Sequence, residues 1–497
     1  MPAFSCFAFS FQRLASFFKL FSARPPTGSD DEMSYEIQRL ADTLSKPIER
    51  RGFYREMQSF LELYSRYVEE KRSAVKLDWT RMAPAGQRIV SFDSLDEIHK
   101  KGKALNKLAI LKVNGGLGLT GAKGALEVKD GLTFLDLTIR QIQHLNKSFR
   151  VDVPLLFMTS FSTYEDTINI IQRYANNSVN ITAFNQSRYP RFFEDTLTLC
   201  PADADASDRT PWYPPGHGDM YAALHRSGVL DRLLSDGKEY LFVSNSDNLG
   251  ATVDMKILDH MVTSRSEFLM EVTDKTRTDV EGGALVDYDG SIRLIELAEI
   301  PLEHRDDFTR KYKTFNTNNL WISIKAIKRV IESGGMHLPI IEKFQDLPDG
   351  RRTVQLETAA GASISYFKNA HGVHVSRTRF LPVKNTSDLL LLKSDLYTID
   401  PNGQIDFSRQ RMFENTPTIK LGDQFRTIEQ FQKRLPTIPN IIDLDHLTVT
   451  GDVHFGRSVT LRGTVVVSAD EGQRIEIPDG TVLENKLLSG TLNMIKL

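Results

Sequence analysis

Apolar, strand-like runs alternate with helical patterns from about residue 105, and this alternation constrains the fold more than any other feature of the chain. Each intervening segment repeats its apolar residues at a spacing of about 3.6. Such an order predicts an α/β fold with a mostly parallel sheet covered on both faces, and ligands then bind beyond the carboxyl ends of the strands. The predicted strands are Leu108–Val113, Pro154–Met158, Val179–Phe184, Tyr240–Val243, Phe268–Val272 and Leu320–Ile324, and the predicted helical segments are Phe134–Leu145, Thr167–Tyr174, Tyr221–Leu234 and Lys256–Met261.

Composition excludes several classes of protein. The 497 residues include 62 Lys and Arg against 64 Asp and Glu, and 40% are hydrophobic. This balance excludes a collagen, a wholly disordered chain and a polytopic membrane protein. A near-neutral charge argues against nucleic-acid binding, because that usually needs a broad positive field. The only cysteines, Cys6 and Cys200, exclude a disulfide framework and a Cys-based zinc site, which fits a reducing, cytoplasmic compartment.

Two N-terminal regions precede the alternating segment. Residues 1–33 form a basic, Phe-rich extension that has the amphipathic pattern of a transit peptide or a surface-binding helix. The alternative, which we favour, is a disordered extension without a targeting role. No run of about 18 apolar residues follows, so we expect no stable membrane insertion. Residues 34–104 read as a small helical part, interrupted at Pro47.

The C-terminal region has a different period. Apolar residues recur every six positions in two parallel rows, which is typical of a parallel β-helix. A small antiparallel sheet with accidental spacing is the alternative. We therefore assign residues 105–400 to a core domain and 401–497 to a C-terminal β-helix domain through which copies of the chain associate. The rows are Leu447, Val453, Val459 and Val465, then Val449, Phe455, Leu461 and Val467, with the pattern resuming at Val482, Leu488 and Met494.

A glycine-rich segment follows the first predicted strand. Gly115 and Gly116 let backbone N–H groups approach a phosphate, and Lys123 adds a positive charge nearby. The spacing of Gly116, Gly118 and Gly121 also satisfies the dinucleotide fingerprint, but no helix opens at these glycines and the expected acidic residue is missing. The alternative is a structural role, in which the glycines form a tight turn.

Polar residues follow other predicted strands. The Gln186 amide offers a donor and an acceptor together, as reading a nucleobase edge requires. Gly216 and His217 lie in a Pro-Gly loop, where a histidine lacks the apolar surroundings of a core residue. Asp247 follows a buried strand and suits Mg²⁺, although an Asx turn competes as an explanation for this segment. Asn318 belongs to an Asn-rich cluster predicted before a strand, and Lys384 to a basic segment that is otherwise a surface salt-bridge patch.

In order along the chain, these motifs resemble those of the eukaryotic-type UTP–glucose-1-phosphate uridylyltransferases, also called UDP-glucose pyrophosphorylases, and look most like the fungal members. The resemblance extends from residue 105 almost to the end. It implies a helical N-terminal part, a Rossmann-like (GT-A-like) nucleotidyltransferase core and a C-terminal left-handed β-helix used in assembly. The segments that carry it are Lys112–Gly118, Thr133–Asp136, Phe184–Arg191, Pro214–Asp219, Phe242–Gly250, Glu271–Thr276, Phe315–Trp321, Gln355–Ala360, Phe380–Asp388 and Leu444–Gly456.

The resemblance also implies a reaction and its residues. UTP and glucose 1-phosphate give UDP-glucose and diphosphate, reversibly, with Mg²⁺, and the protein is expected to be a homo-oligomer of carbohydrate metabolism. The implied catalytic residues are Lys384 and Lys123. The implied nucleotide ligands are Gly115, Gly116, Gln186, Gly216 and Asp247, with Asp247 also holding the metal, and the implied sugar-phosphate ligands are His217, Asn245 and Asn318.

The glycine segment departs from the family pattern. The family carries Thr-Ser-Met-Gly between the residues matching Gly118 and the stretch ending in the lysine, whereas here Gly118 runs directly into Leu119. Glu281 stands where a lysine is usual. We therefore expect an intact fold with impaired activity. A non-catalytic or regulatory subunit of the same family is the alternative, and an NAD-dependent dehydrogenase ranks last.

Overall fold

The computed structural model of the chain describes residues 29–73, 77–78, 81–96, 103–117, 121–176, 178–204, 208–276, 279, 282–412 and 415–490. The Phe-rich pattern of residues 4–21, the shortened loop at Gly118–Thr120, Glu281 and Met494 lie outside these residues. The described residues form two compact units. The first draws on residues up to 75, 188–213 and 342–356, and the second contains the remaining segments.

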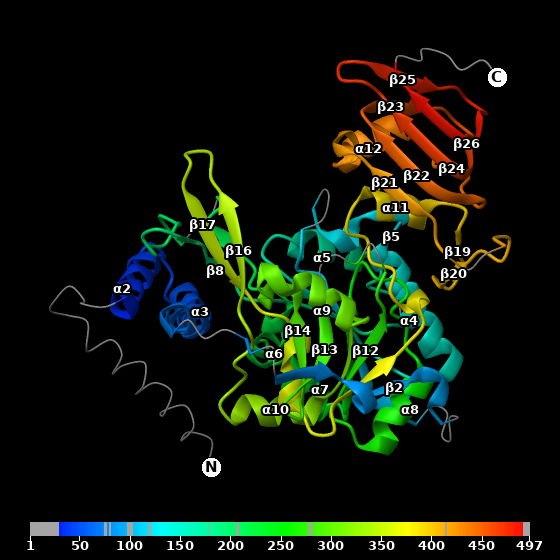
Figure 1. The fold of residues 1–497 in the computed structure, drawn as a ribbon. Helices are drawn as coiled ribbons and strands as arrows, with labels where there is room; N and C mark the ends of the chain where they lie inside the picture. The colour runs from blue at the N-terminus through cyan, green and yellow to red at the C-terminus, as the bar shows by residue number, and fades with distance from the viewer. Residues whose placement is uncertain are drawn as a thin grey trace. The chain divides into compact units, whose positions relative to one another are not determined.

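The first unit is built on two helices and short strands (Figure 1). Helix α2 (Ser29–Asp42) and helix α3 (Pro47–Ser73) are separated at Pro47, as the sequence predicts, since proline suits the first turn of a helix. Aromatic side chains of α3 pack on the strands. The ring centroids of Phe60 and Tyr189 lie 5.5 Å apart. The strands of this unit are β8 (Tyr189–Pro190), β9 (Phe192–Phe193), β10 (Trp212–Tyr213), β16 (Ile341–Asp346) and β17 (Arg352–Glu357). The first residue of β16 and the last residue of β17 belong to the second unit.

An eight-stranded sheet forms the centre of the second unit, in the order β2-β18-β12-β15-β11-β3-β6-β7 (Figure 1). Every neighbouring pair is parallel except those of β15, which runs antiparallel to both β11 and β12. The mostly parallel sheet predicted from the alternation is confirmed. Its strands are β2 (Ile89–Ser91), β3 (Leu108–Val113), β6 (Leu155–Thr159), β7 (Ile181–Asn185), β11 (Tyr240–Asn245), β12 (Phe268–Asp274), β15 (Thr314–Ser323) and β18 (His371–His374).

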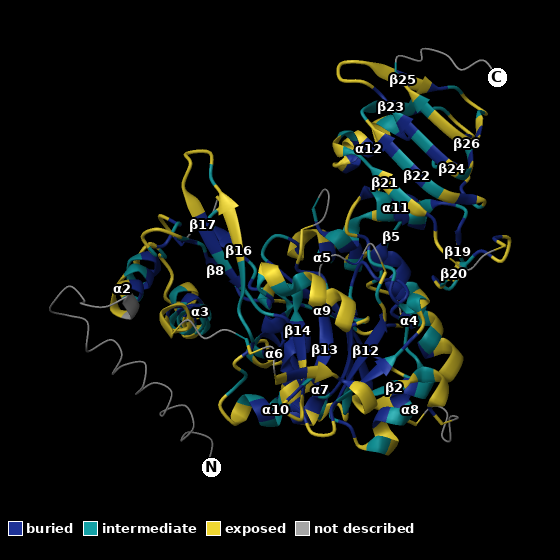
Figure 2. Ribbon diagram, in the orientation of Figure 1, coloured by how far each residue is buried: buried dark blue, intermediate teal, exposed yellow. Residues whose placement is uncertain are grey.

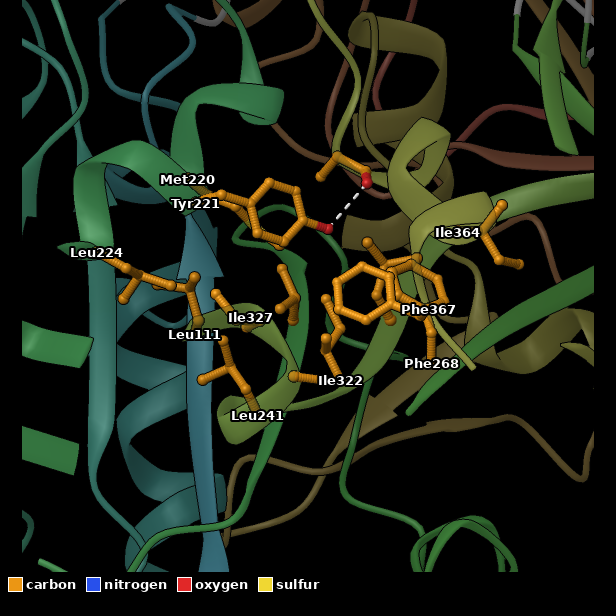
Figure 3. Close-up of a cluster of buried hydrophobic side chains, with 14 of the residues drawn as sticks. Leu111, Met220, Tyr221, Leu224, Leu241, Phe268, Ile322, Ile327, Ile364 and Phe367 are labelled. Atoms are coloured by element: carbon orange, nitrogen blue, oxygen red, sulfur yellow. Dashed lines mark hydrogen bonds between the residues drawn. The ribbon is translucent and has the colours of Figure 1, made fainter. Parts of the chain in front are cut away.

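Helices cover both faces of this sheet, and each face has its own apolar core. One core joins strand residues such as Leu111 and Leu241 to helices α6 (Met220–Arg226), α7 (Val229–Ser235) and α10 (Ile324–Glu332). Figure 3 shows Tyr221 and Phe367 in this core, where the Tyr221 hydroxyl donates to Ala360 O at 3.0 Å. The other core packs Ile110 and Phe242 against α4 (Phe134–Phe149), α5 (Tyr164–Gln172) and α8 (Met255–Ser264). Figure 2 accordingly shows strands of this sheet in the dark blue of buried residues, whereas the outer faces of the helices are exposed.

Two elements differ from the sequence prediction. Strand β15 begins at Thr314, so the Asn-rich cluster that includes Asn318 lies within a strand and not before one. The predicted helical segment Tyr221–Leu234 is two helices, because Gly228 adopts a positive φ of 74° between α6 and α7. The break at Gly228 follows the local preference of glycine for positive φ, whereas at the Asn-rich cluster the sheet overrides the low strand preference of asparagine.

Smaller elements complete the second unit. Strands β1 (Met82–Pro84), β13 (Gly283–Tyr288) and β14 (Ser291–Glu296) form a three-stranded antiparallel sheet. Helix α11 (Thr386–Lys393) begins with a capping box at Asn385. The other elements are β4 (Glu127–Lys129), β5 (Leu132–Thr133), α9 (Arg305–Lys311), β19 (Tyr397–Ile399), β20 (Ile405–Phe407) and α12 (Ile428–Arg434).

The C-terminal strands form two parallel sheets, β21-β22-β24-β26 and β23-β25. All residues of the two complete hexad rows are buried, as their spacing predicts. The predicted resumption at Val482 is wrong, because Val482 is 44% exposed and its neighbour Leu483 is buried opposite Leu461. The strands are β21 (Thr418–Leu421), β22 (Leu444–Thr450), β23 (Asp452–Phe455), β24 (Thr460–Ser468), β25 (Arg474–Ile477) and β26 (Val482–Ser489).

Among the described residues, no helix has the length and apolar character needed to cross a membrane.

Candidate active site

Asn114 organises the carboxyl end of the central strand β3. Its side chain is buried and donates to Thr167 Oγ1 at 2.8 Å. Its Oδ1 atom accepts the backbone N–H of Gly124 at 3.0 Å and the hydroxyl of Ser246 at 2.8 Å. One amide therefore links the segment that carries Lys123 to the loop that carries Asp247. Sequence reasoning missed this role, although Asn114 directly precedes the glycines.

The first two glycines after β3 face different surroundings. A Cβ atom on Gly115 would lie 1.7 Å from Gln186 Nε2, whereas one on Gly116 would meet nothing within 4 Å. Gln186 follows strand β7, and its backbone N–H donates to Thr159 O at 2.9 Å. The Gln186 side chain is 4% exposed, and its Oε1 atom is buried without a hydrogen-bond partner among the described residues. An unpaired buried amide oxygen is unfavourable, and an N–H group of a ligand would satisfy it.

The Pro-Gly loop packs closely on the strand-like segment at Thr358. Gly216 has a φ of +86°, and a Cβ atom there would lie 2.8 Å from Thr358 O. The next residue, His217, accepts the backbone N–H of Ala360 at its Nδ1 atom, at 2.9 Å. In the neutral ring the proton must then reside on Nε2, because one nitrogen accepts while the other donates. At position 216, the positive φ and the close approach to Thr358 O both require glycine.

Strand β11 ends at Asn245, and Asp247 follows in the next turn. Asp247 is 5% exposed, and its Oδ2 atom lies 3.2 Å from Lys123 Nζ. The sequence places these two residues 124 positions apart, and the fold brings them together. Asp247 also acts on its surroundings, since its charge helps to raise the pKa of the Asp388 carboxyl, for which burial is the main cause.

The Asn-rich part of β15 lies beside Asn245. Asn318 donates from Nδ2 to Asn245 Oδ1 at 2.8 Å, and its own Oδ1 atom is buried without a partner among the described residues. Asn318 has a φ of +58°, a conformation that non-glycine residues seldom adopt. Strained backbone of this kind concentrates at functional sites. The structure therefore brings together the two amides predicted to bind the sugar phosphate.

Lys384 has contacts of its own, distinct from those of the Lys123–Asp247 pair. Its Nζ atom lies over the ring of Phe315, 5.7 Å from the centroid, and its backbone N–H donates to Asp388 Oδ2 at 2.8 Å. The side chain belongs to an exposed residue just before helix α11. The positive charge of Lys384 also acts on Glu296. Burial raises the pKa of the Glu296 carboxyl to about 7, and Lys384 acts in the opposite direction.

A buried network behind the site joins the Asp247 loop to the Lys384 segment. Glu271 on β12 is fully buried and receives two hydrogen bonds of 2.7 Å from the Arg379 guanidinium. Asn248 accepts the backbone N–H of Leu381 at 2.9 Å and donates to Arg379 O at 3.1 Å. The basic segment that includes Arg379 is therefore not simply a surface patch. The only sequence signal for this network is an acidic residue, Glu271, within an apolar strand.

The donor set of the site suits a metal ion that is shared with a substrate. Mg²⁺ commonly binds one or two protein carboxylates together with phosphate oxygens and water. Asp247 offers one carboxylate at the edge of the sheet, whereas the described residues contain no group of three or more His, Cys, Asp or Glu side chains able to hold a metal. Asp247 fits Mg²⁺ of the shared kind and not a closed site made by protein alone.

Comparison with known proteins agrees with this architecture. The family described as UTP–glucose-1-phosphate uridylyltransferase matches residues 57–462. The chain is 47% identical to the UTP–glucose-1-phosphate uridylyltransferase of Saccharomyces cerevisiae, covering 94% of this chain and 95% of that protein. The Solanum tuberosum enzyme of the same name is also 47% identical, over 88% of this chain and 93% of the relative.

Solved structures of similar proteins share the fold. The UDP-glucose phosphorylase of Trypanosoma brucei superimposes with a TM-score of 0.80 at 32% identity, covering 91% of this chain and 98% of that one. A single-residue mutant of the Leishmania major UDP-glucose pyrophosphorylase, in complex with UDP-glucose, gives a TM-score of 0.79 at 31% identity, covering 91% and 99%. Fold and matches define a nucleotidyltransferase with a mixed α/β architecture. More narrowly, the chain belongs to the UTP–glucose-1-phosphate uridylyltransferase family, and the fungal likeness is confirmed.

Proposed function

We propose that the residues around Asn114 transfer a uridylyl group from UTP to glucose 1-phosphate, giving UDP-glucose and diphosphate in a reversible reaction. The observation that carries this proposal is the buried Gln186 amide against Gly115, with an unpaired oxygen. Uracil presents an N–H donor between two carbonyl acceptors, so a fixed amide is complementary to its edge. The backbone at Gly216 completes the uracil end of the site, and Gly116 leaves room for the nucleotide.

Charge neutralisation accounts for the chemistry at the other end. A phosphate oxygen of glucose 1-phosphate attacks the α-phosphorus of UTP in line, and diphosphate leaves. The attacking oxygen is already ionised, so the protein needs no general base and mainly positions two polyanions. Lys123 and Lys384 supply positive charge. Asp247 would hold Mg²⁺, which when bound offsets negative charge on the phosphates.

The sugar phosphate has its own set of polar groups. His217, with its proton on Nε2, can donate a hydrogen bond, and the linked amides of Asn245 and Asn318 offer donors and acceptors to sugar hydroxyls. The buried unpaired Oδ1 of Asn318 supports this role, because a sugar hydroxyl would satisfy it. The strained backbone at Asn318 orients that oxygen.

The test is a coupled assay of UDP-glucose formation with and without Mg²⁺, together with a UDP-glucose binding measurement. An active enzyme forms product from UTP only with the metal present. A non-catalytic subunit would bind UDP-glucose without forming it, and no observation here favours that alternative. Reduction of a nicotinamide cofactor would instead support a dehydrogenase. Failure to form UDP-glucose with Mg²⁺ present would overturn the proposal, and UDP-glucose binding in that case would support the non-catalytic subunit.

We infer also that the parallel C-terminal sheets belong to a left-handed β-helix through which copies of the chain associate in the cytoplasm. The two buried hexad rows support this inference, as does the register of β22 on β24, where Leu447 pairs with Val465 and Val449 with Val467. Light scattering on the full chain and on a truncation before residue 440 tests it. The truncated chain should form assemblies with fewer subunits than the full chain does, and an unchanged subunit number would contradict the inference.

A further inference from the structure

A cavity of 230 Å³ lies on the α4 and α8 side of the central sheet. Strands β3 and β11 form its floor, helix α4 one wall, and residues 251–255 and 402–404 the opposite wall. Apolar side chains line most of it, including Ile110, Phe242, Leu145 and Val253. None of the residues proposed to bind UTP or glucose 1-phosphate lines this cavity, so it is separate from the active site.

One buried charge faces this apolar cavity. Lys112 on β3 is 2% exposed and lines the cavity from the strand. Its ammonium donates to Ser244 Oγ at 2.8 Å and to Ala251 O at 3.0 Å. An ammonium has three donors, so one remains for another acceptor. Within the described part of the chain, no carboxylate lies within ion-pair distance of Lys112.

The charge balance of the cavity favours an anion. Of the side chains that line it, the two ionisable ones are Lys112 and His144, and both are basic. Burial and the Arg379 guanidinium lower the pKa of Lys112 to about 7, while Glu271 and Asp247 act in the opposite direction. An uncompensated ammonium in an apolar interior is costly, and a negative group beside it removes that cost.

We propose that this cavity binds a compact organic monoanion whose carboxylate meets the Lys112 ammonium and whose apolar ring packs between Phe242 and Leu145. Its size suits such a ligand, because a cavity of about 150 Å³ accommodates benzene. The volume here is larger than that cavity, which leaves room for a carboxylate beside the ring. The exposed Phe149 and Gln404 side chains at its edge mark the entrance.

Lys112 also couples the cavity to the active site. The two groups that its ammonium binds, on Ser244 and Ala251, flank the loop that carries Asn245 and Asp247. A carboxylate on the third donor draws the ammonium toward the cavity, which lengthens these two bonds and loosens that loop. The ligand therefore acts as an inhibitor that raises the KM for substrate, and linkage requires substrate to weaken the ligand equally. This second step rests on the proposed function, whereas binding itself does not.

Benzoate is the probe, and benzyl alcohol is its neutral control. Calorimetry on the full chain without nucleotide should show benzoate binding at least 10-fold more tightly than benzyl alcohol. Gln404→Trp closes the entrance from an exposed position and should weaken benzoate at least 10-fold, whereas Gln404→Ala should not. Lys112→Met should weaken benzoate similarly, and a crystal soaked with benzoate should show its carboxylate at Nζ. Equal binding of the two probes, or full binding to Gln404→Trp, would overturn the proposed site.

Kinetics test the coupling separately. Benzoate should raise the KM for UTP or glucose 1-phosphate at least 3-fold in the natural chain but not in Gln404→Trp. Binding without any change in KM would overturn the coupling and leave the site standing. A chain that binds benzoate yet forms no UDP-glucose would overturn the proposed function instead, so the failures are distinguishable.

Discussion

The uracil end of the proposed site is formed by close packing, whereas the phosphate end is formed by charges that contact one another. At the uracil end, Gln186 lies against Gly115 in a position that a side chain on that glycine would exclude. At the phosphate end, Lys123 and Asp247 satisfy each other at 3.2 Å. The first end is already complementary to a ligand, while the second must exchange an internal partner for a substrate.

Removing the charge of Asp247 should have the largest effect. Asp247→Asn keeps the shape of the side chain but removes the carboxylate proposed to hold Mg²⁺, so kcat should fall by about 10³-fold, as when a major electrostatic group is lost. Steady-state kinetics over a range of Mg²⁺ concentrations measures it. The matched control is Asp274→Asn, because Asp274 is 81% exposed at the end of strand β12 of the same sheet. Equal losses in both variants would remove Asp247 from the phosphate end.

Glu296 probes the surroundings of Lys384. Its pKa rises from 4.5 to about 7 in the folded protein because of burial. The folded state therefore retains a proton that the unfolded state loses, and stability falls as pH rises from about 4.5 to 7. Glu296→Gln removes this dependence, so its stability advantage over the natural chain should grow by up to about 3 kcal/mol between pH 4.5 and 8. Denaturant unfolding at both pH values measures it, and a constant difference would contradict this.

A methyl group at Gly115 tests the packed end. Gly115→Ala should displace the Gln186 amide and raise the KM for UTP about 10- to 100-fold, the effect of losing one or two buried hydrogen bonds. Gly52→Ala is the comparison, since Gly52 lies in helix α3 of the first unit and its Cβ atom would meet nothing within 4 Å, and a much smaller change is expected. Kinetics with UTP at saturating glucose 1-phosphate distinguishes them. If both variants behave alike, Gln186 does not set the geometry of the uracil end.

The sequence predicts the strands that position the site better than it predicts the side-chain contacts within the site. Strand β3 and the positions of Gln186 and Asp247 after β7 and β11 follow from apolar runs that end in polar residues. Such runs are local, so local periodicity detects them. The packing of Gln186 on Gly115 and the pairing of Lys123 with Asp247 join residues far apart in the chain. Sequence pattern alone does not encode them, and the resemblance assigned these residues to one site without predicting either contact.

The sequence predictions are wrong at positions where a local pattern or preference does not continue. The hexad period was continued to Val482, but the register of β24 on β26 shifts between Arg462 and Val465, and Leu483 occupies the buried position opposite Leu461. Asn318 was predicted in a cluster before a strand, yet it lies within β15 with a positive φ. Asn114 and Glu271 were missed because their partners come from segments that only the fold brings near.

The glycine-rich segment after β3 gives a further test of the phosphate end, with the smallest expected effect on activity. Leu117 and Ala122 form an isolated antiparallel bridge, and Ala122 N lies 3.4 Å from Asp166 Oδ2. Both ends of the segment are thus held, and residues inserted after Gly118 would extend the loop without moving Lys123 from Asp247. Insertion of Thr-Ser-Met-Gly adds backbone N–H groups for the outer phosphates of UTP.

We expect that insertion to raise kcat about 10-fold, roughly the effect of one or two further phosphate contacts. Insertion of Gly-Ser-Gly-Ser at the same place is the control for length alone, and both chains are compared by single-turnover kinetics. A gain with either insert would show that length matters more than sequence. No gain with either would mean that the short loop already serves the phosphates, and the phosphate end would then be as complete before ligand binding as the uracil end.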